Sequence, residues 1–244
     1  MTTEGSAEFA FAEQVAGIAA LDEPTRARLY QWVVEAGEPV SRDQAAAALG
    51  IARSVAAFHL DKLVDAGLLE TEFRRLTGRR GPGAGRPAKL YRRSSRELQV
   101  SLPERRYDVA GRVLADAVWS ASSQDVPIDE AVATSARDLG RSLASRVRDR
   151  AGAGASATQL RGALLEVLGE QGYGPQADSE RITLGNCPFR LLAQDYTDLV
   201  CEMNLTALAE TVAAVPEASV HAELSPAPGR CCVELRLDEV AGAA

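Results

Sequence analysis

Four cysteines near the end of this chain are the side chains best suited to bind a metal or to react. They are Cys187, Cys201, Cys231 and Cys232, with the spacing C-x13-C-x29-CC, and no cysteine occurs before residue 187. A zinc ribbon needs two close C-x2-C pairs, and thiol oxidoreductases use one such pair, so neither kind of site is expected. In a reducing compartment such cysteines are thiols or metal ligands more often than disulfides.

The surroundings of the cysteines indicate how they could meet. Cys187 lies in the turn sequence Asn-Cys-Pro-Phe, Cys201 in a predicted helix, and Cys231 and Cys232 at the start of a predicted strand. Neighbouring residues on a strand point to opposite faces, so at most one of this pair is expected to join a shared site. Three thiolates from a turn, a helix and a strand would bind an iron–sulfur cluster, or zinc or another thiophilic metal. The alternative is that the cysteines are small buried hydrophobic residues.

The basic segment 74–96 is the second feature with binding chemistry. It contains eight arginines, one lysine and no acidic residue, which is a charge of +9. The whole chain has a net charge of −7, so the other residues together carry −16. A basic segment on an acidic protein attracts a polyanion to one place and repels it elsewhere.

The residues before the basic segment have the pattern of a helix-turn-helix. Ser41 begins the sequence Ser-Arg-Asp-Gln, which predicts a capping box and a short helix that ends at Gly50. A second helix is predicted from about residue 53 to 66, with Ala56, Leu60 and Leu63 on one inward face. The remaining side chains of this helix are the candidates for contact with a DNA major groove: Arg53, Ser54, Ala57, Phe58, His59 and Lys62.

Two of these candidates have an alternative interpretation. Phe58 is a large apolar side chain that would contact a thymine methyl group. It would otherwise pack on a neighbouring helix or on the hairpin that follows. His59 would donate to a phosphate from the edge of the helix, or be a half-buried structural histidine.

A β-hairpin is predicted directly after these helices. Its strands are residues 68–73 and 88–93, and the glycine-rich loop between them contains Arg79, Arg80 and Arg86. Arginine binds phosphate through its planar fork and enters a narrow minor groove. A solvated charged loop is the alternative, but the position beside a helix-turn-helix favours contact with double-stranded DNA.

The rest of the chain predicts a fold that is mainly α with small β regions. We expect an N-terminal winged helix-turn-helix domain over 1–100 and a helical middle region over 101–152. A small C-terminal α+β sensor domain with the cysteines is expected over 153–244. In the middle region a capping box at Ser101 predicts a helix to about residue 121, and a second helix follows over 128–150. These helices are expected to pair with a second copy, because helix-turn-helix repressors usually bind DNA as dimers.

The segment LGIARSVAAFHLDKLVDAGLL resembles the winged helix-turn-helix of bacterial ArsR/MarR/DeoR-like repressors. The hairpin sequence GRPAKLY is similar to a wing found in a narrower group that includes the SufR-type repressors. The segments NCPF, VCEMN and RCCVEL are also similar to the C-terminal pattern of that group. In it, three cysteines ligate an iron–sulfur cluster that sets DNA affinity.

The resemblance implies specific ligands. Cys187 and Cys201 match the first two cluster cysteines directly, and the third matches Cys231 or Cys232, with Cys232 preferred because it precedes the Val-Glu-Leu strand. The adjacent pair departs from the family pattern. A fourth ligand would be His221, Glu202, an exogenous thiol or a partner chain. By the same resemblance, the loaded form would repress genes for iron–sulfur assembly.

Composition excludes several other classes of protein. With 46% hydrophobic and 25% charged residues the chain is expected to be globular, and it contains no apolar run long enough to cross a bilayer. The first residues do not have the pattern of a secretory signal, so a cytoplasmic location is expected. No catalytic motif of the common hydrolases, NTPases or zinc proteases occurs, so we do not expect an enzyme. Two alternatives remain: a winged-helix regulator that senses a small organic ligand, with incidental cysteines, and a protein–protein module.

Overall fold

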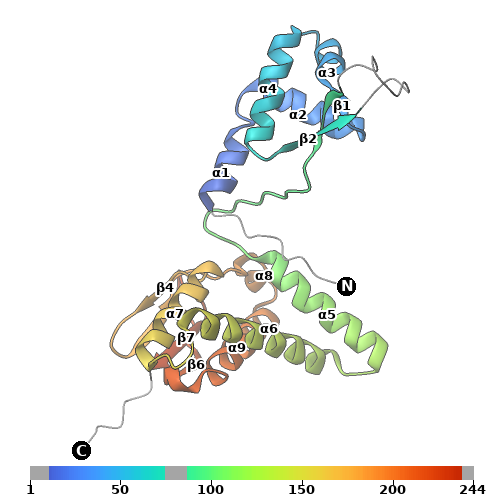
Figure 1. Ribbon diagram of the computed structural model, residues 1–244. Helices are drawn as coiled ribbons and strands as arrows, with labels where there is room; N and C mark the ends of the chain where they lie inside the picture. Colours follow the sequence, from blue (N-terminus) through green and yellow to red (C-terminus); the bar gives the residue numbers. More distant parts are fainter. Residues whose placement is uncertain (1–10, 75–86, 238–244) are drawn as a thin grey trace, which may run out of the picture. The chain divides into compact units, whose positions relative to one another are not determined.

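The computed structural model describes residues 11–74 and 87–237. The chain forms two compact units, residues 1–100 and 101–244, and each is described by itself. Figure 1 gives the element labels used below.

Most of the described residues of the N-terminal unit belong to four helices. They are α1 (Phe11–Ala19), α2 (Pro24–Ala36), α3 (Arg42–Leu49) and α4 (Arg53–Asp65). Ser41 caps α3 through the predicted capping box, in which its hydroxyl accepts from the Gln44 amide. Asp22 is expected to cap α2, but Glu23 does so, because Pro24 occupies the first helical position and the residue before it becomes the cap.

A three-stranded antiparallel sheet completes the N-terminal unit. It contains β1 (Val40–Ser41), β2 (Leu69–Arg74) and β3 (Ala88–Arg93) in the order β1-β3-β2. The hairpin β2–β3 is confirmed, with Thr71 opposite Tyr91. Strand β1 is too short to be recognised from the sequence, and it lies on β3 just before α3 begins.

The core of the N-terminal unit lies between its helices and the sheet. Leu29 and Val33 of α2, Leu60 and Leu63 of α4, and Tyr91 of β3 are all buried in one hydrophobic cluster. The inward face predicted for α4 is therefore confirmed, and burial of its leucines fixes which face of α4 is turned outward.

The C-terminal unit combines five helices of α type with four strands and a short 3₁₀ turn among the described residues. The helices are α5 (Tyr107–Gln124), α6 (Ile128–Ala151), α7 (Ala157–Glu170), α8 (Arg190–Asp195) and α9 (Thr197–Ala213), and the 3₁₀ turn is η1 (Pro216–Ala218). The strands are β4 (Pro175–Ala177), β5 (Arg181–Leu184), β6 (Val220–Leu224) and β7 (Val233–Leu237), which form an antiparallel sheet in the order β4-β5-β7-β6.

The helix predicted from Ser101 begins later than expected. Helix α5 starts at Tyr107, and the Ser101 hydroxyl donates to the Pro103 carbonyl instead of accepting from a helical amide. Tertiary contacts delay the start of the helix, because the residues before α5 hydrogen-bond to the turn that contains Cys187. The similar pattern at Ser156 does form a capping box and begins α7.

The two long helices share one core with the rest of the C-terminal unit. Helix α6 packs against α5, α7 and α9, and α9 packs against the sheet (Figure 1). Gly140 of α6 allows the closest contact, since a Cβ there would lie 2.4 Å from the Ala207 carbonyl oxygen of α9. The predicted middle region 101–152 and the predicted α+β region therefore lie in the same compact unit.

The predicted fold class is confirmed in its coarse form, since the protein is mostly helical with small antiparallel sheets. Over the described residues 11–74 and 87–237, the helices are all too short or too polar to span a membrane.

Candidate functional site

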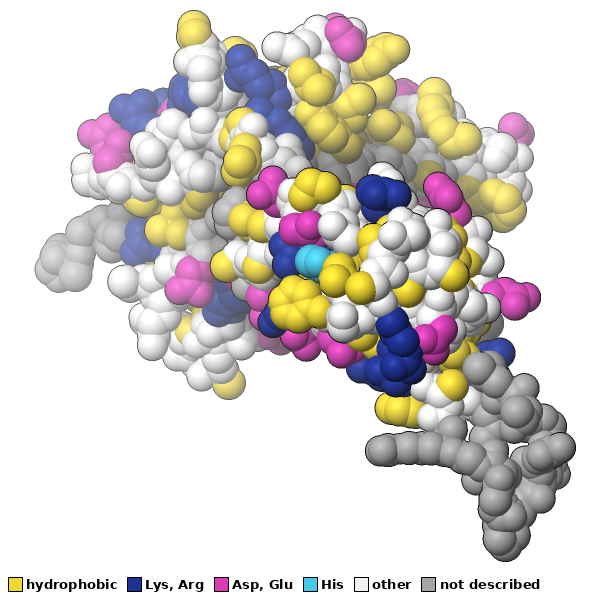
Figure 2. Space-filling view, turned by 90° about the horizontal axis from the view of Figure 1, so that it is seen from above, with side chains coloured by type: hydrophobic (Ala, Val, Ile, Leu, Met, Phe, Trp, Pro, Cys, Tyr) yellow, Lys and Arg dark blue, Asp and Glu magenta, His cyan; other side chains and the backbone are white. Residues whose placement is uncertain are grey.

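The outward face of α4 is mixed in chemistry. Ser54 and Lys62 are exposed, Ala57 is half-buried, and Phe58 is 57% exposed. Phe58 makes an edge contact with the ring of His59, at 5.2 Å between ring centroids, and is not buried against another helix. On the face seen in Figure 2, hydrophobic side chains (yellow) and basic side chains (dark blue) reach the surface beside one another. Such a surface offers contacts for both bases and phosphates.

His59 lies at the edge of this face and is only partly accessible. Its Nδ1 is 3.3 Å from the Glu23 carboxylate, and its side chain is 14% exposed. The same carboxylate accepts from the amides of Thr25 and Arg26 at the start of α2. His59 therefore links α4 to α2, which favours the structural interpretation of this residue.

An open pocket of about 510 Å³ lies beside the first turn of α4. It is lined by Arg42, Arg53, Ser54 and Ala57. Arg53 also pairs with Asp43 across the turn between α3 and α4. Arg42 is a residue that the sequence pattern did not single out, although its place directly after the capping serine put it at the start of α3. Two arginines beside helix N-termini make this pocket attractive to an anionic group.

Asp61 joins α4 to the hairpin. Its Oδ1 accepts from Lys89 Nζ at 2.6 Å and from the Tyr91 hydroxyl at 2.9 Å. Partial burial raises the pKa of Asp61, but the hydrogen bonds from Lys89 and Tyr91 outweigh it, so the pKa lies below its usual value. Burial and the bond to Asp61 raise the pKa of Tyr91, which stays a neutral donor. The position of the hairpin relative to α4 is thus set by a carboxylate.

Part of the basic segment is neutralised within the unit. Arg74 pairs with Glu72 at 2.7 Å, and Arg92 pairs with Glu70 at 3.0 Å. Arg96 donates to one backbone carbonyl after α4 at 3.4 Å and to another in α1 at 3.3 Å. These cations hold the hairpin together or join helices. The predicted loop contacts Arg79, Arg80 and Arg86 lie outside the described residues.

The four cysteines come together in the C-terminal unit. Cys187 follows β5, Cys201 lies in the second turn of α9, and Cys231 and Cys232 lie immediately before β7. A pocket of about 240 Å³ is lined by Cys187, Cys201 and Cys232, together with residues of α8 and of the loop before β7. Neither candidate fourth ligand, His221 nor Glu202, lines this pocket.

The thiols are close enough to shift one another's pKa values. A bond from Cys231 lowers the pKa of the Cys187 thiol to about 7, against the opposing effect of burial. Bonds from Cys231 and Cys201 lower the pKa of the Cys232 thiol to about 6. Burial and the bond to Cys232 raise the pKa of Cys201 to about 12, and the pKa of Cys231 is raised by its bonds to both neighbours. The pKa shifts therefore favour ionisation of Cys187 and Cys232 before Cys201 and Cys231.

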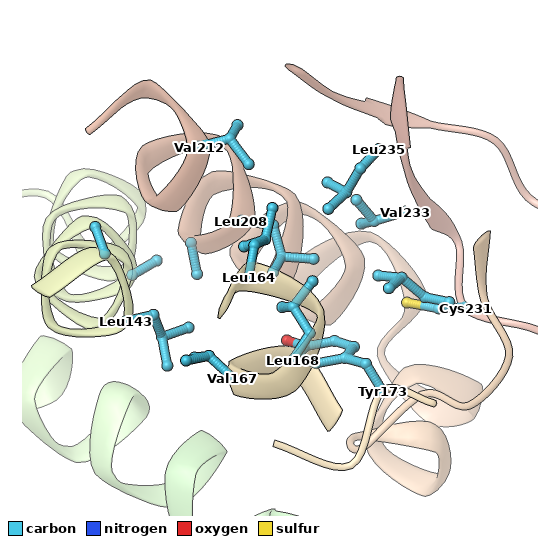
Figure 3. Packing of buried hydrophobic residues seen from close by; sticks show 14 of the residues in the cluster. Leu143, Leu164, Val167, Leu168, Tyr173, Leu208, Val212, Cys231, Val233 and Leu235 are labelled. Carbon is cyan, nitrogen blue, oxygen red and sulfur yellow. The ribbon is translucent and has the colours of Figure 1, made fainter. Parts of the chain in front are cut away.

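Cys231 is the buried member of the network. Its side chain is fully inaccessible, and its sulfur accepts from Asn204 Nδ2 at 3.3 Å. The Asn204 amide oxygen in turn accepts from the Tyr173 hydroxyl at 2.5 Å. Figure 3 shows Cys231 and Tyr173 in the same cluster as Val233. Cys231 therefore connects the cysteine site to the hydrophobic core of the C-terminal unit.

The adjacent cysteines lie just outside the predicted strand. Strand β7 begins at Val233, so Cys231 and Cys232 are not strand residues, and the alternation of strand faces does not apply to them. Of the two, Cys232 lines the pocket and Cys231 is fully buried, so the expectation that at most one of them joins a shared site stays a prediction. In the part of the chain that the structure describes, however, no three side chains of His, Cys, Asp or Glu form a ready-made site for a single metal ion.

An ion cluster positions the loop before β7. Arg230 donates to the backbone and hydroxyl oxygens of Ser225, at 2.9 and 2.8 Å, and pairs with Glu234. The Glu234 carboxylate is 1% exposed and also lies 3.2 Å from Arg236 and 3.7 Å from Arg181. Because Arg230 precedes Cys231 and lines the pocket, this cluster holds the adjacent cysteines in place.

Residues 21–72 match the family model of a helix-turn-helix domain. The match covers α2, α3 and α4 and most of β2, which are the elements described above around the exposed face of α4. No curated protein and no solved structure matches the chain. The helix-turn-helix match indicates a DNA-binding transcription regulator, and it does not extend to the cysteine-containing unit.

Proposed function

We propose that this protein is a transcriptional repressor whose affinity for its operator is set by an iron–sulfur cluster, or a thiophilic metal, bound at the cysteine site. The observation that carries the proposal is the meeting of thiols from three separate segments at one pocket, in a chain with a helix-turn-helix domain.

The donor set fits such a group. Thiolate sulfur is the ligand that iron–sulfur clusters and soft metals prefer. Arg190 and Arg230 line the same pocket, and positive charge stabilises the thiolates that ligation requires. When bound, a cluster supplies sensitivity to oxidation and to iron supply.

The N-terminal unit supplies the DNA contacts in this proposal. Helix α4 enters the major groove with Ser54, Phe58 and Lys62, and Arg42 and Arg53 bind a phosphate beside its first turn. The hairpin lies along the backbone, at a distance from α4 that Asp61 sets. The chain's own residues therefore bind and position the duplex without any chemical step.

A homodimer is part of the proposal. Helix α5 and the start of α6 carry large exposed hydrophobic side chains: Val118, Trp119 and Ile128 are 59%, 71% and 53% exposed. Burying them against a second copy gives a two-fold molecule that binds two half-sites about 34 Å apart.

Anaerobic purification followed by iron and acid-labile sulfide assays tests the cofactor. Fluorescence anisotropy with operator DNA, before and after controlled oxidation, tests the regulation. We expect a brown protein whose operator affinity falls by about 5- to 150-fold on cluster loss. The variants Cys187→Ser and Cys201→Ser are expected to be colourless and unresponsive.

Two outcomes would overturn the proposal. An iron-free protein that binds its operator equally well before and after oxidation removes the cluster. Regulation that survives both serine variants favours a small organic ligand instead. The pocket at the cysteines, at about 240 Å³, is small for such a ligand, because ligand pockets commonly measure about 300–1,000 Å³.

A further inference from the structure

The residues that lead from the DNA-binding unit into the C-terminal unit lie directly on the cysteine turn. Residues 101–106 precede α5 and are the first residues of the C-terminal unit. Arg105 Nη1 donates to the Asn186 side-chain oxygen at 2.5 Å and to the Cys187 carbonyl at 3.1 Å. The Arg106 amide donates to the Pro188 carbonyl at 3.1 Å. Three consecutive residues of the turn therefore hold two consecutive residues of this entry segment.

Asn186 ties the entry segment to a second part of the unit. Its Nδ2 donates to the Glu104 carbonyl at 2.9 Å and to the Gly172 carbonyl at 2.5 Å, and its backbone amide donates to the Tyr173 carbonyl at 2.8 Å. Gly172 has a φ of +78°, and a Cβ on it would lie 3.2 Å from Cγ of Glu104. The side chain of Asn186 thus joins three segments that are far apart in the sequence.

The entry segment also lies close to the cysteine site and to α7. Hydrogen bonding from Cys231 is the main reason for the lowered pKa of Cys187, and the Arg105 guanidinium contributes to the same lowering. The coupling rests on the hydrogen bonds of Arg105 to the Asn186 side chain and the Cys187 carbonyl. A second arginine bond, from Arg106 Nη1 to the Glu170 carbonyl at 3.1 Å, fixes the far end of the segment on α7.

We propose that Arg105 and Asn186 are positioning residues that couple the cysteine site to the segment that enters the DNA-binding unit. The inference rests on the proposed function, and it identifies the route by which that site would act. Ligation of Cys187 fixes the turn 186–189, and the turn in turn fixes residues 104–106 through the bonds of Asn186 and Arg105. Release of Cys187 loosens both the turn and the segment.

Hydrogen exchange of the full-length protein tests the coupling. Two perturbations are applied: anaerobic loading with ferrous iron and sulfide, and alkylation of the thiols with iodoacetamide. Alkylation changes the Cys187 side chain whether or not the chain takes up iron. In the wild type, exchange at residues 101–106 is expected to change by about fivefold, the factor that corresponds to about one hydrogen bond.

Asn186→Ala and Arg105→Gln are expected to abolish this change, while Arg112→Gln, on the exposed side of α5, is expected to keep it. Arg105→Gln leaves the bonds of Asn186 to Glu104 and Gly172 in place, so it serves if Asn186→Ala fails to fold. In the DNA assay both variants should load iron like the wild type but lose the difference in affinity between the loaded and free forms.

The possible failures of the two proposals are distinct. If the wild-type protein takes up no iron, the proposed cofactor is overturned. The hydrogen-exchange measurement after alkylation then still tests the coupling. Unchanged exchange at residues 101–106 in the wild type after both perturbations overturns the coupling. So does a variant at Arg105 or Asn186 that responds as strongly as the wild type.

Discussion

Removal of the Asp61 carboxylate is expected to weaken the contact between α4 and the hairpin and so to lower the free energy of unfolding. In Asp61→Ala, the buried Tyr91 hydroxyl loses the acceptor at 2.9 Å, and an unpaired buried polar group costs about 1–3 kcal/mol. The pair with Lys89 is 34% and 50% exposed, so its loss adds at most about 0.5 kcal/mol. We expect a loss of about 2 kcal/mol in the free energy of unfolding of the N-terminal unit.

A double-mutant cycle isolates the pair. Tyr91→Phe alone removes one hydrogen bond to a partly exposed carboxylate and is expected to cost about 1 kcal/mol. The double variant leaves no orphaned group and should cost no more than Asp61→Ala, which gives a coupling energy of about 1 kcal/mol. Urea unfolding followed by the fluorescence of Trp32 measures this unit alone if Trp119, 71% exposed, is first replaced by Phe.

The pH dependence gives an independent check. Because the pKa of Asp61 is lowered on folding, its contribution is present in full above its usual value near 3.8 and is lost as the pH falls through the lowered pKa. A coupling energy below about 0.3 kcal/mol at neutral pH, within the range of additive sites, would refute the assigned hydrogen bonds. A coupling that grows on acidification would refute the assigned charge.

Three further predictions concern the C-terminal unit. Gly140→Ala would drive a Cβ into the α9 backbone and is expected to destabilise the unit by about 1–3 kcal/mol. Gly111→Ala on α5 meets no atom within 4 Å and should stabilise by about 0.5–1 kcal/mol, so thermal melts that rank the two variants the other way would contradict the α6–α9 packing. Glu234→Ala leaves arginines around a buried site without their carboxylate and is expected to cost roughly 3 kcal/mol in urea unfolding, far more than Glu223→Ala on the partly exposed face of β6. In metal-free protein, mass spectrometry after iodoacetamide treatment should find Cys231, which is fully buried, the last thiol modified, and cluster loading should protect the other three; early labelling of Cys231 would contradict its burial.

Local signals in the sequence predicted local structure well. The capping box at Ser41 began a helix where expected, and the same Ser-x-x-Gln pattern at Ser156 begins α7, because this pattern satisfies the first amides without help from the rest of the chain. The inward face of α4 and the hairpin followed in the same way from periodicity. The similar pattern at Ser101 failed, because hydrogen bonds from a turn more than 80 residues away hold the residues that follow it.

The cysteine site could be predicted only in part. The spacing of the cysteines gave a reason to look for a shared site, but their meeting depends on how α8, α9 and β7 pack. The rule of alternating faces does not apply to Cys231 and Cys232, because the strand begins two residues later than expected. Arg42 and Asn186 were missed because each acts through neighbours that only the folded chain brings near.

The paired cations of the hairpin have a consequence for how the protein would respond to ionic strength. Arg74, Lys89 and Arg92 are each matched by an acidic side chain, so three of the nine positive charges of segment 74–96 are already balanced before any ligand arrives. Counterion release on association would then reflect fewer phosphates per chain than the nine positive charges of this segment suggest. Joint replacement of Arg74 with Glu72, or of Arg92 with Glu70, would therefore leave the long-range attraction of this segment for DNA unchanged.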